Sequence, residues 1–303
     1  MPFNLSRSIN HKIDLNEKCD LELFIKREDL IHPDISGNKY RKLKYNIIEA
    51  ENQGYRTLLS FGGAYSNHIS ALAKVGQELG LKTIGVIRGE ELESRIYDNP
   101  TLRFASSCDM RFKFITRESY RSKNNEKFIE ELKNEFGSFY PIPEGGTNEL
   151  AIKGCEEILT EHDKTFDFVC CSVGTGGTIS GIIDSSHNAQ EILGFPALKG
   201  DFLVKEISKF TKKENWQLIN DYHFGGYAKI NEELIAFINE FKSEHGIALD
   251  PVYTGKMMFG IMDLLKKGFF PKGSRVLAIH TGGLQGIAGM NNVLMKKQLP
   301  LIT

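Results

Sequence analysis

The chain has 303 residues, of which 41% are hydrophobic and 25% charged, and this predicts about two domains with proper apolar cores. Its formal net charge of −1 and its lack of a bilayer-length apolar run argue against nucleic acid and membranes as partners, and "MPFNLSRSINHKIDL" is no signal peptide. The cysteines, odd in number with one adjacent pair, favour reduced, packed thiols in a cytoplasmic protein over a disulfide framework: Cys19, Cys108, Cys155, Cys170 and Cys171.

Short β-rich runs alternate with helical stretches along the whole chain. In chain order, the predicted strands are 21–28, 56–61, 82–89, 111–115, 166–173, 191–198 and 274–279. The predicted helices are 40–54, 68–80, 97–107, 124–137, 149–162, a segment after 178, 201–211, 230–246, 255–268 and 284–294. This alternation predicts an α/β fold of two domains, each an open, mostly parallel twisted sheet with helices on both faces.

Four glycine-rich segments follow predicted strands: "GGAYSNH", "EGGTN", "GTGGT" and "HTGG". Ligand loops in open α/β sheets lie at the carboxyl ends of strands, so these segments are the candidate binding loops. We expect the chain to break between its two domains in the "PIPEGGTN" loop, residues 141–148.

The "VGTGGT" segment is a candidate phosphate site, because its glycines let backbone N–H groups turn inward at the start of a helix. It is not a nucleoside-triphosphate loop, since it lacks the GxxxxGK[ST] pattern. A dinucleotide loop and a simple glycine turn remain alternatives, although the next strand ends without an acidic residue for a ribose. The loop residues are Gly174, Thr175, Gly176, Gly177 and Thr178.

Lys39, in "SGNKYRK", is either a solvated lysine in the first turn of a helix or a lysine that forms an imine with an aldehyde cofactor. Proximity to a helix N-terminus and to Arg41 and Lys42 would lower its pKa and favour the second role. Together with a phosphate loop, this lysine points to pyridoxal phosphate.

Further candidates have both a structural and a functional interpretation. In "GGAYSNH", Ser66 and Asn67 either cap a helix or contact a cofactor, and Ser66 or His68 could move protons. In "DPVYTGK", Tyr253 is either a packed core tyrosine or a site residue, and Thr254 either a helix cap or a hydroxyl ligand. Thr281 follows a buried strand.

These motifs occur in one order that resembles the 1-aminocyclopropane-1-carboxylate deaminase / D-cysteine desulfhydrase family, within the tryptophan-synthase-β-like, fold type II pyridoxal-phosphate enzymes. The resemblance spans residues 24 to 286 and rests on "IKRED", "SGNKYRKL", "GGAYSNH", "EGGTN", "VGTGGT", "DPVYTGK" and "HTGG". It implies a large cofactor-binding domain of residues 1–40 plus 147–303 and a small inserted domain of residues 41–146. It also implies pyridoxal 5'-phosphate as cofactor, a small amino acid as substrate and a homodimer.

The resemblance implies a role for each candidate. Lys39 would carry the Schiff base, and Lys39, Ser66 and Tyr253 would be catalytic. The cofactor would be bound by Lys39, Asn67, Gly174, Thr175, Gly176, Gly177, Thr178, Thr254 and Thr281, with Thr254 near the pyridine nitrogen. The substrate would meet Ser66, Asn67, His68, Tyr227 and Tyr253. Gly37 and Asn38 would shape the approach to Lys39, and Arg41 and Lys42 would set the local charge.

Two positions favour one branch of this family. Members that open the cyclopropane ring tend to have an acidic residue after the "DPVY" tyrosine and leucine in "HLGG". This chain has Thr254 and Thr281 there. Neutral hydroxyls give a weaker electron sink, adequate for loss of the α-proton and β-elimination. The resemblance therefore implies D-cysteine desulfhydrase activity, giving pyruvate, ammonia and sulfide.

Other functions remain open from the sequence. Within the same cofactor class the chain could be a 1-aminocyclopropane-1-carboxylate deaminase, a D-amino-acid dehydratase or a racemase. A non-catalytic pyridoxal-phosphate- or nucleotide-binding α/β protein is the alternative of a different class. The proton-transfer group is Lys39 or Ser66.

Overall fold

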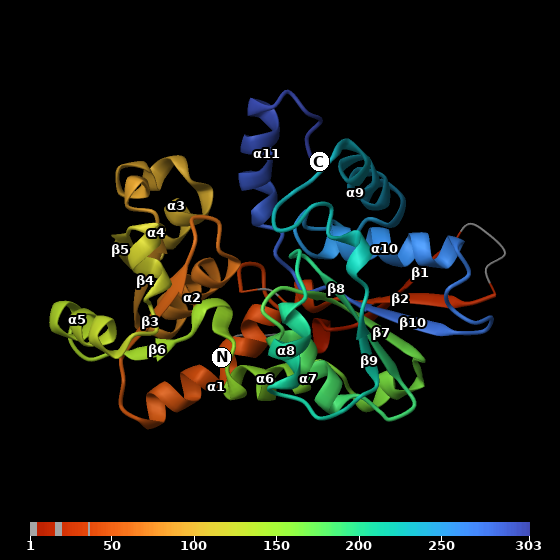
Figure 1. Cartoon of the computed structure of the whole chain (residues 1–303), viewed down its shortest axis with the longest axis horizontal. Helices are drawn as coiled ribbons and strands as arrows, with labels where there is room; N and C mark the ends of the chain where they lie inside the picture. Colours follow the sequence, from red (N-terminus) through yellow and green to blue (C-terminus); the bar gives the residue numbers. More distant parts are fainter. Residues whose placement is uncertain (1–4, 16–19, 36) are drawn as a thin grey trace.

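The computed structural model describes residues 5–15, 20–35 and 37–303 and contains two sheets (Figure 1). The larger sheet has six strands in the order β1 (Asn10–Ile13), β2 (Glu22–Lys26), β10 (Arg275–Ile279), β7 (Phe168–Val173), β8 (Glu191–Pro196) and β9 (Trp216–Leu218). The smaller has the order β5 (Arg111–Ile115), β4 (Lys82–Arg88), β3 (Thr57–Gly62) and β6 (Tyr140–Ile142). All neighbours pair in parallel except β1 with β2. The predicted α/β fold with two mostly parallel sheets is confirmed.

The central strands are buried over nearly their whole length, as parallel strands covered on both faces must be. Five of the six residues are buried in each of β3, β7 and β8. The prediction missed β1, β6 and β9, which have three or four residues each and lack a long apolar run. Of these, β6 lies in the segment predicted as a loop, and its Pro141 is tolerated because β6 is an edge strand.

Helices cover both faces of each sheet. In the larger unit, α9 and α10 lie on one face and α6, α7 and α8 on the other; α2 to α5 surround the smaller sheet (Figure 1). The helices are α1 Asn38–Asn52, α2 Asn67–Leu79, α3 Pro100–Ser107, α4 Arg117–Arg121, α5 Glu126–Phe136, α6 Glu149–Glu156, α7 Gly177–Ser185, α8 Phe202–Ser208, α9 Glu232–His245, α10 Thr254–Lys266 and α11 Gly286–Lys296.

Helices α3 and α6 are shorter than predicted, for local reasons. The side chain of Asn99 caps α3 and Pro100 takes its first position, so the helix cannot start at residue 97. Helix α6 ends at Glu156, and Thr160 caps a separate 3₁₀ turn, Glu161–Thr165. The smaller sheet lies within residues 41–146, the span we propose as an inserted domain; its boundaries remain a prediction.

Each sheet has one point at which the strand order reverses. In the larger sheet β8 and β9 extend from β7 in one direction while β10 lies on its other side. In the smaller sheet β4 and β5 extend from β3 while β6 lies on its other side. Loops that leave such a pair of strands diverge and open a crevice at their carboxyl ends. The four loops after β3, β6, β7 and β10 are the four glycine-rich segments.

Four described cysteines, Cys108, Cys155, Cys170 and Cys171, are free and buried, as predicted, whereas Cys19 lies outside the described residues. Among the helices that the structure describes, none has the length and apolar character needed to cross a membrane.

Glycines set the spacing of α1, α6 and α7. A Cβ on Gly154 of α6 would lie 1.9 Å from the carbonyl oxygen of Arg41 in α1. A Cβ on Gly181 of α7 would lie 2.6 Å from the carbonyl oxygen of Ile152 in α6. Both neighbours are backbone atoms, which cannot move aside as a side chain does, so α1 and α7 approach α6 this closely only because of glycine.

We expect Gly154→Ala to destabilise the fold by at least about 2 kcal/mol, because it overpacks a backbone contact. The sign of the change in unfolding free energy is informative, because alanine in place of glycine inside an unobstructed helix stabilises the fold by about 1 kcal/mol. Urea denaturation measures the change, and Glu156→Ala, an exposed change in the same helix, is the control. Unchanged or increased stability of Gly154→Ala would contradict the close packing.

Candidate active site

The four glycine-rich loops meet in one place. The ammonium of Lys42 in α1 donates to the carbonyl of Gly145 at 3.0 Å and to Thr147 Oγ1 at 2.9 Å, both in the loop after β6. The hydroxyls of Thr147 and Thr175 lie 2.6 Å apart, which joins that loop to the one after β7. A Cβ on Gly283, in the loop after β10, would lie 2.9 Å from Asn67 Nδ2, so this loop abuts the one after β3.

Lys39 lies beside this meeting point. Gly37 precedes α1 with φ +63°, and a Cβ there would lie 2.0 Å from the carbonyl oxygen of Thr281, so glycine is needed for the approach. The amine of Lys39 donates to Asn38 Oδ1 at 3.1 Å, and Asn38 Nδ2 donates to Thr178 Oγ1 at 2.9 Å. The amine is therefore one side chain away from the glycine loop at the start of α7.

Two amines lie in this region, that of the buried Lys42 and that of the partly buried Lys39. Burial, with the nearby charge of Lys42, lowers the pKa of Lys39 to about 7. Burial also lowers the pKa of Lys42, which is 2% exposed. Within residues 5–15, 20–35 and 37–303, neither amine has a carboxylate at ion-pair distance, and the partners of Lys42 are hydroxyls and a carbonyl. An anion bound here would offset this uncompensated positive charge.

The segment 174–178 forms a concave turn under the Lys42 ammonium. Gly176 caps α7 with φ +88°, a conformation that favours glycine. A Cβ on Gly177 would lie 3.3 Å from Lys42 Nζ and 2.8 Å from a methyl carbon of Thr147. Thr178 is buried and Thr175 is exposed. A helix N-terminus, glycine backbone and a buried ammonium together make an anion site.

His68 is a buried, neutral ring rather than a charged ligand. Ser60 Oγ donates to the carbonyl of Ile142 at 2.8 Å, and we therefore assign the proton of His68 to Nε2, which lies 2.8 Å from the same hydroxyl. Burial and the charges of Lys39 and Lys42 lower the pKa of His68 to about 3. Its Nδ1 is buried without a hydrogen-bond partner. A neutral ring brings no positive charge to a ligand.

Ser66 and Asn67 lie at the start of α2. Ser66 Oγ accepts from the Ile69 N–H at 3.3 Å, so the capping interpretation of Ser66 is correct. Both side chains are only partly buried, which leaves their remaining polar atoms available to a ligand.

The two candidate threonines differ in what their hydroxyls contact. Thr254 is fully buried; its hydroxyl donates to Asp250 Oδ2 at 2.8 Å and accepts from the Asp250 N–H at 2.9 Å. Thr281 Oγ1 lies 3.2 Å from Ser172 Oγ across β10 and β7. Thr254 thus stabilises the start of α10, and Thr281 is the better placed of the two to offer a hydroxyl to a ligand.

Two tyrosines flank the loop after β7. A Cβ on Gly174 would lie 3.1 Å from the ring of Tyr253, so this ring packs directly on the loop. The rings of Tyr253 and Tyr227 meet edge to face with centroids 6.2 Å apart. Tyr227 is half-exposed, and burial raises the pKa of both phenols. Both phenols stay neutral near pH 7.

The sequence underestimated two residues. Lys42 was given only a role in local charge, although its position three residues after Lys39 places both on one side of the first helical turn. Asp250 was not considered, although an aspartate ahead of a helix is a known capping signal. Its carboxylate accepts from the N–H groups of Val252, Tyr253 and Thr254.

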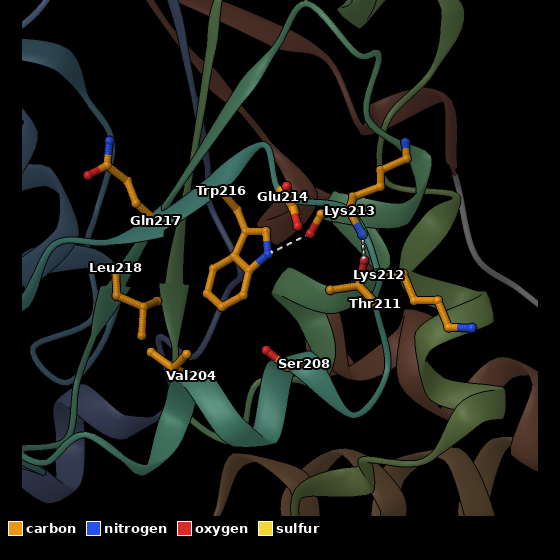
Figure 2. A pocket seen from close by; sticks show the side chains of 9 residues that line it. All are labelled: Val204, Ser208, Thr211, Lys212, Lys213, Glu214, Trp216, Gln217 and Leu218. Atoms are coloured by element: carbon orange, nitrogen blue, oxygen red, sulfur yellow. Dashed lines mark hydrogen bonds between the residues drawn. The ribbon is translucent and has the colours of Figure 1, made fainter.

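A separate surface pocket of about 430 Å³ lies between α8 and the edge strand β9 (Figure 2). Trp216 lines it, and the indole N–H donates to the carbonyl of Lys213 at 2.9 Å. The pocket is lined by residues 204, 208, 211–214 and 216–218, none of which belongs to the four loops.

Comparison with known proteins agrees with this geometry. A family model described as "Pyridoxal-phosphate dependent enzyme" matches residues 11–282. A 1-aminocyclopropane-1-carboxylate deaminase from Rhizobium rhizogenes is 31% identical, with 89% of each chain covered. The chain belongs to the 1-aminocyclopropane-1-carboxylate deaminase / D-cysteine desulfhydrase family of pyridoxal-phosphate-dependent enzymes. The predicted resemblance and cofactor are confirmed.

Further relatives bear on function and fold. The bifunctional D-cysteine desulfhydrase/1-aminocyclopropane-1-carboxylate deaminase of Arabidopsis thaliana is 31% identical over 88% of this chain and 73% of its own. A solved structure of an ACC deaminase homologue superimposes with a TM-score of 0.78 at 29% identity, covering 91% of this chain and 88% of that one. The predicted fold type II architecture of this family is confirmed.

The residues of this chain fit the family's cofactor. Its phosphate requires a cationic, N–H-rich cradle, and the 174–178 turn with Lys42 is such a cradle. Its aldehyde requires an amine that is unprotonated near neutral pH, and the environment of Lys39 provides one.

We expect the amine of Lys39 in the cofactor-free protein to react with acetic anhydride with a midpoint near pH 7. At pH 7 about half of it is unprotonated, against roughly one in 3,000 for an ordinary lysine. Its reactivity should fall as the pH drops through 7. Mass spectrometry of peptides measures the modification, and added pyridoxal phosphate should protect the residue.

Lys44 is the matched control on the same helix, because Glu157 raises its pKa. The two lysines should therefore show separate pH profiles. Coincident profiles would contradict the inferred environment of Lys39.

Proposed function

We propose that this enzyme catalyses α,β-elimination from D-cysteine, giving pyruvate, ammonia and hydrogen sulfide. The observation that carries the proposal is the Lys39 amine, with its pKa near 7, held through Asn38 against the start of α7. An amine with this pKa can act at neutral pH both as a nucleophile toward an aldehyde and as a base.

The cofactor would be held by residues from three of the four loops and α1. Lys39 would join it covalently, and residues 174–178 with Lys42 would hold its phosphate. Asn67 would donate to a ring oxygen, and Thr281 would offer its hydroxyl to the ring nitrogen. Thr254, predicted for the ring nitrogen, has its hydroxyl engaged with Asp250, so we assign that position to Thr281 alone. Bound pyridoxal phosphate supplies an electron sink for bonds at the substrate's α-carbon.

Lys39 is our candidate for the proton transfer. Once the substrate's amino group has displaced it from the cofactor, its Nζ would take the proton from the α-carbon. The β-carbon–sulfur bond would then break, and sulfur would leave with its electron pair as hydrosulfide, which a proton converts to hydrogen sulfide. One water then replaces the amino group, so D-cysteine and water account for all atoms of pyruvate, ammonia and hydrogen sulfide. Ser66, which caps α2 through its oxygen, keeps its hydroxyl proton free for the substrate carboxylate.

The substrate would occupy the space bounded by α2 and the two tyrosines. Ser66 and Asn67 are partly buried at the start of α2. The ring of Tyr227 packs edge to face on Tyr253, whose own ring lies on the loop after β7. Polar groups on one side and neutral rings on the other suit a small amino acid with a compact, weakly polar side chain. In this proposal His68 does not contact the substrate; it bonds Ser60 of β3, which in turn bonds the end of β6.

1-Aminocyclopropane-1-carboxylate deamination is the second candidate, because relatives carry that name and one carries both. That substrate has no α-proton, so ring opening demands a stronger electron sink at the cofactor. A carboxylate beside the ring nitrogen would supply it, and this chain has the hydroxyl of Thr281 instead. We therefore favour elimination. The cytoplasmic location and the homodimer remain proposals that rest on the free cysteines and on the resemblance.

We expect the purified protein to absorb as a pyridoxal-phosphate enzyme and to release pyruvate from D-cysteine faster than from L-cysteine, D-serine or 1-aminocyclopropane-1-carboxylate. Lys39→Ala should lower kcat by roughly a thousandfold or more, since nucleophile and base are both lost. Lys44→Ala, on the same helix, is the control. Full turnover by Lys39→Ala would contradict the mechanism, and preference for the cyclopropane substrate would favour the second candidate.

The two threonines should respond differently to removal of the hydroxyl. Thr281→Val should lower kcat roughly tenfold, through loss of one hydrogen bond to the cofactor, and lower the free energy of unfolding by only about 1 kcal/mol, through loss of its contact with Ser172. Thr254→Val should lower the free energy of unfolding by about 2 kcal/mol, through its bonds to Asp250, with kcat of the folded enzyme within about threefold. Steady-state kinetics and urea denaturation measure both. The reverse pattern would return the cofactor role to Thr254.

A further inference from the structure

The segment that carries Tyr227 has an unusual backbone. Between β9 and α9, four residues have φ in the left-handed region: Phe224 at 54°, Gly225 at 90°, Gly226 at 116° and Ala228 at 54°. Two of them are not glycine, and such residues persist in this region only when surrounding contacts hold them. The contacts that hold this segment therefore determine where the Tyr227 ring stands.

The Lys256 ammonium is the strongest of these contacts. Lys256 lies in α10, is 2% exposed, and donates to the carbonyl of His223 at 2.9 Å and to that of Gly226 at 2.8 Å. Hydrogen bonds from a charged donor are stronger than those between neutral groups. Burial lowers its pKa to about 8, which records the cost of keeping this amine away from water.

Neighbouring contacts leave Tyr227 dependent on this ammonium. Phe224 is fixed by an edge-to-face contact with Phe259 of α10, centroids 5.0 Å apart. The half-exposed Tyr227 ring, beyond Gly226, meets Tyr253. Tyr253 precedes α10 and Lys256 follows three residues later, so one helical turn supplies both the ring that Tyr227 packs on and the cation that holds its loop.

We propose that Lys256 is a positioning residue, whose ammonium holds residues 223–228 so that Tyr227 stands against Tyr253 on the substrate side of the site. This rests on the proposed function, in which the two tyrosines bound the substrate. Lys256 acts on substrate binding through Tyr227 and does not itself contact cofactor or substrate.

Limited trypsin digestion tests the loop contact independently of activity. Lys229 is exposed directly after the loop, and the bond after it should be cut about tenfold faster in Lys256→Met, since loss of a charged hydrogen bond loosens the segment. Lys266→Met, an exposed change on the same helix, should be cut like the original protein. An unchanged cleavage rate in Lys256→Met, mapped by mass spectrometry, would overturn the proposal whatever the enzyme's substrate.

Kinetics then test the action through Tyr227. In the pyridoxal-phosphate-loaded enzyme, Lys256→Met should raise KM for D-cysteine about tenfold and leave kcat within about threefold. On a Tyr227→Ala background the same change should leave KM unaltered, because the ring it positions is gone. Additive effects of the two changes would overturn the proposal. Absence of any turnover of D-cysteine would refute the proposed function instead, with the digestion still deciding the loop contact.

Gly225→Ala gives a second route if Lys256→Met does not fold. Gly225 is exposed, has φ 90°, and meets only the side chain of Lys229 at 3.7 Å, so alanine strains the loop without touching the core. The same rise in KM is expected, with a thermal midpoint lowered by only a few degrees. An unaltered KM would overturn the dependence of substrate binding on this loop.

Discussion

Two neighbouring amines, that of the buried Lys42 and that of the partly buried Lys39, are the constraint around which the site is built. Their burial is costly, and no carboxylate among the described residues pairs with them. The protein tolerates one charge by surrounding Lys42 with a carbonyl and hydroxyls, and the other by lowering the pKa of Lys39. Lys42 is thereby suited to bind an anion and Lys39 to react with an aldehyde, the two groups that pyridoxal phosphate combines.

The sheet topology explains why such a site lies between two bodies. Each sheet reverses its strand order once, and each reversal opens a crevice at the carboxyl ends of two parallel strands. Helix α1 spans both bodies: Lys42 contacts the loops after β6 and β7, and Gly37 lies against the end of β10. A ligand bound where these loops meet would contact residues from both sheets.

Polar residues near the site divide into those that meet the ligand space and those that support the backbone. Thr254 and Asp250 satisfy one another at the start of α10, and Ser60 bonds His68 through Nε2, with Ser60 also bonded to the carbonyl of Ile142 before the loop after β6. We place Lys256 among the supporting residues, because it bonds the backbone of the segment 223–228, which carries Tyr227. In sequence Thr254 and His68 look like ligands, because the same polar groups serve both purposes.

The sequence by itself determined the fold class and the cofactor, and it predicted the four ligand loops and the role of Lys39. These depend on local patterns: strand-helix alternation, glycine after strands, and motifs in fixed order. It missed the short strands β1, β6 and β9, which exist only through pairing with neighbours. Only the tertiary structure showed that His68 is a buried, neutral ring and that the Thr254 hydroxyl is engaged with Asp250, because burial and side-chain contacts depend on how the chain packs.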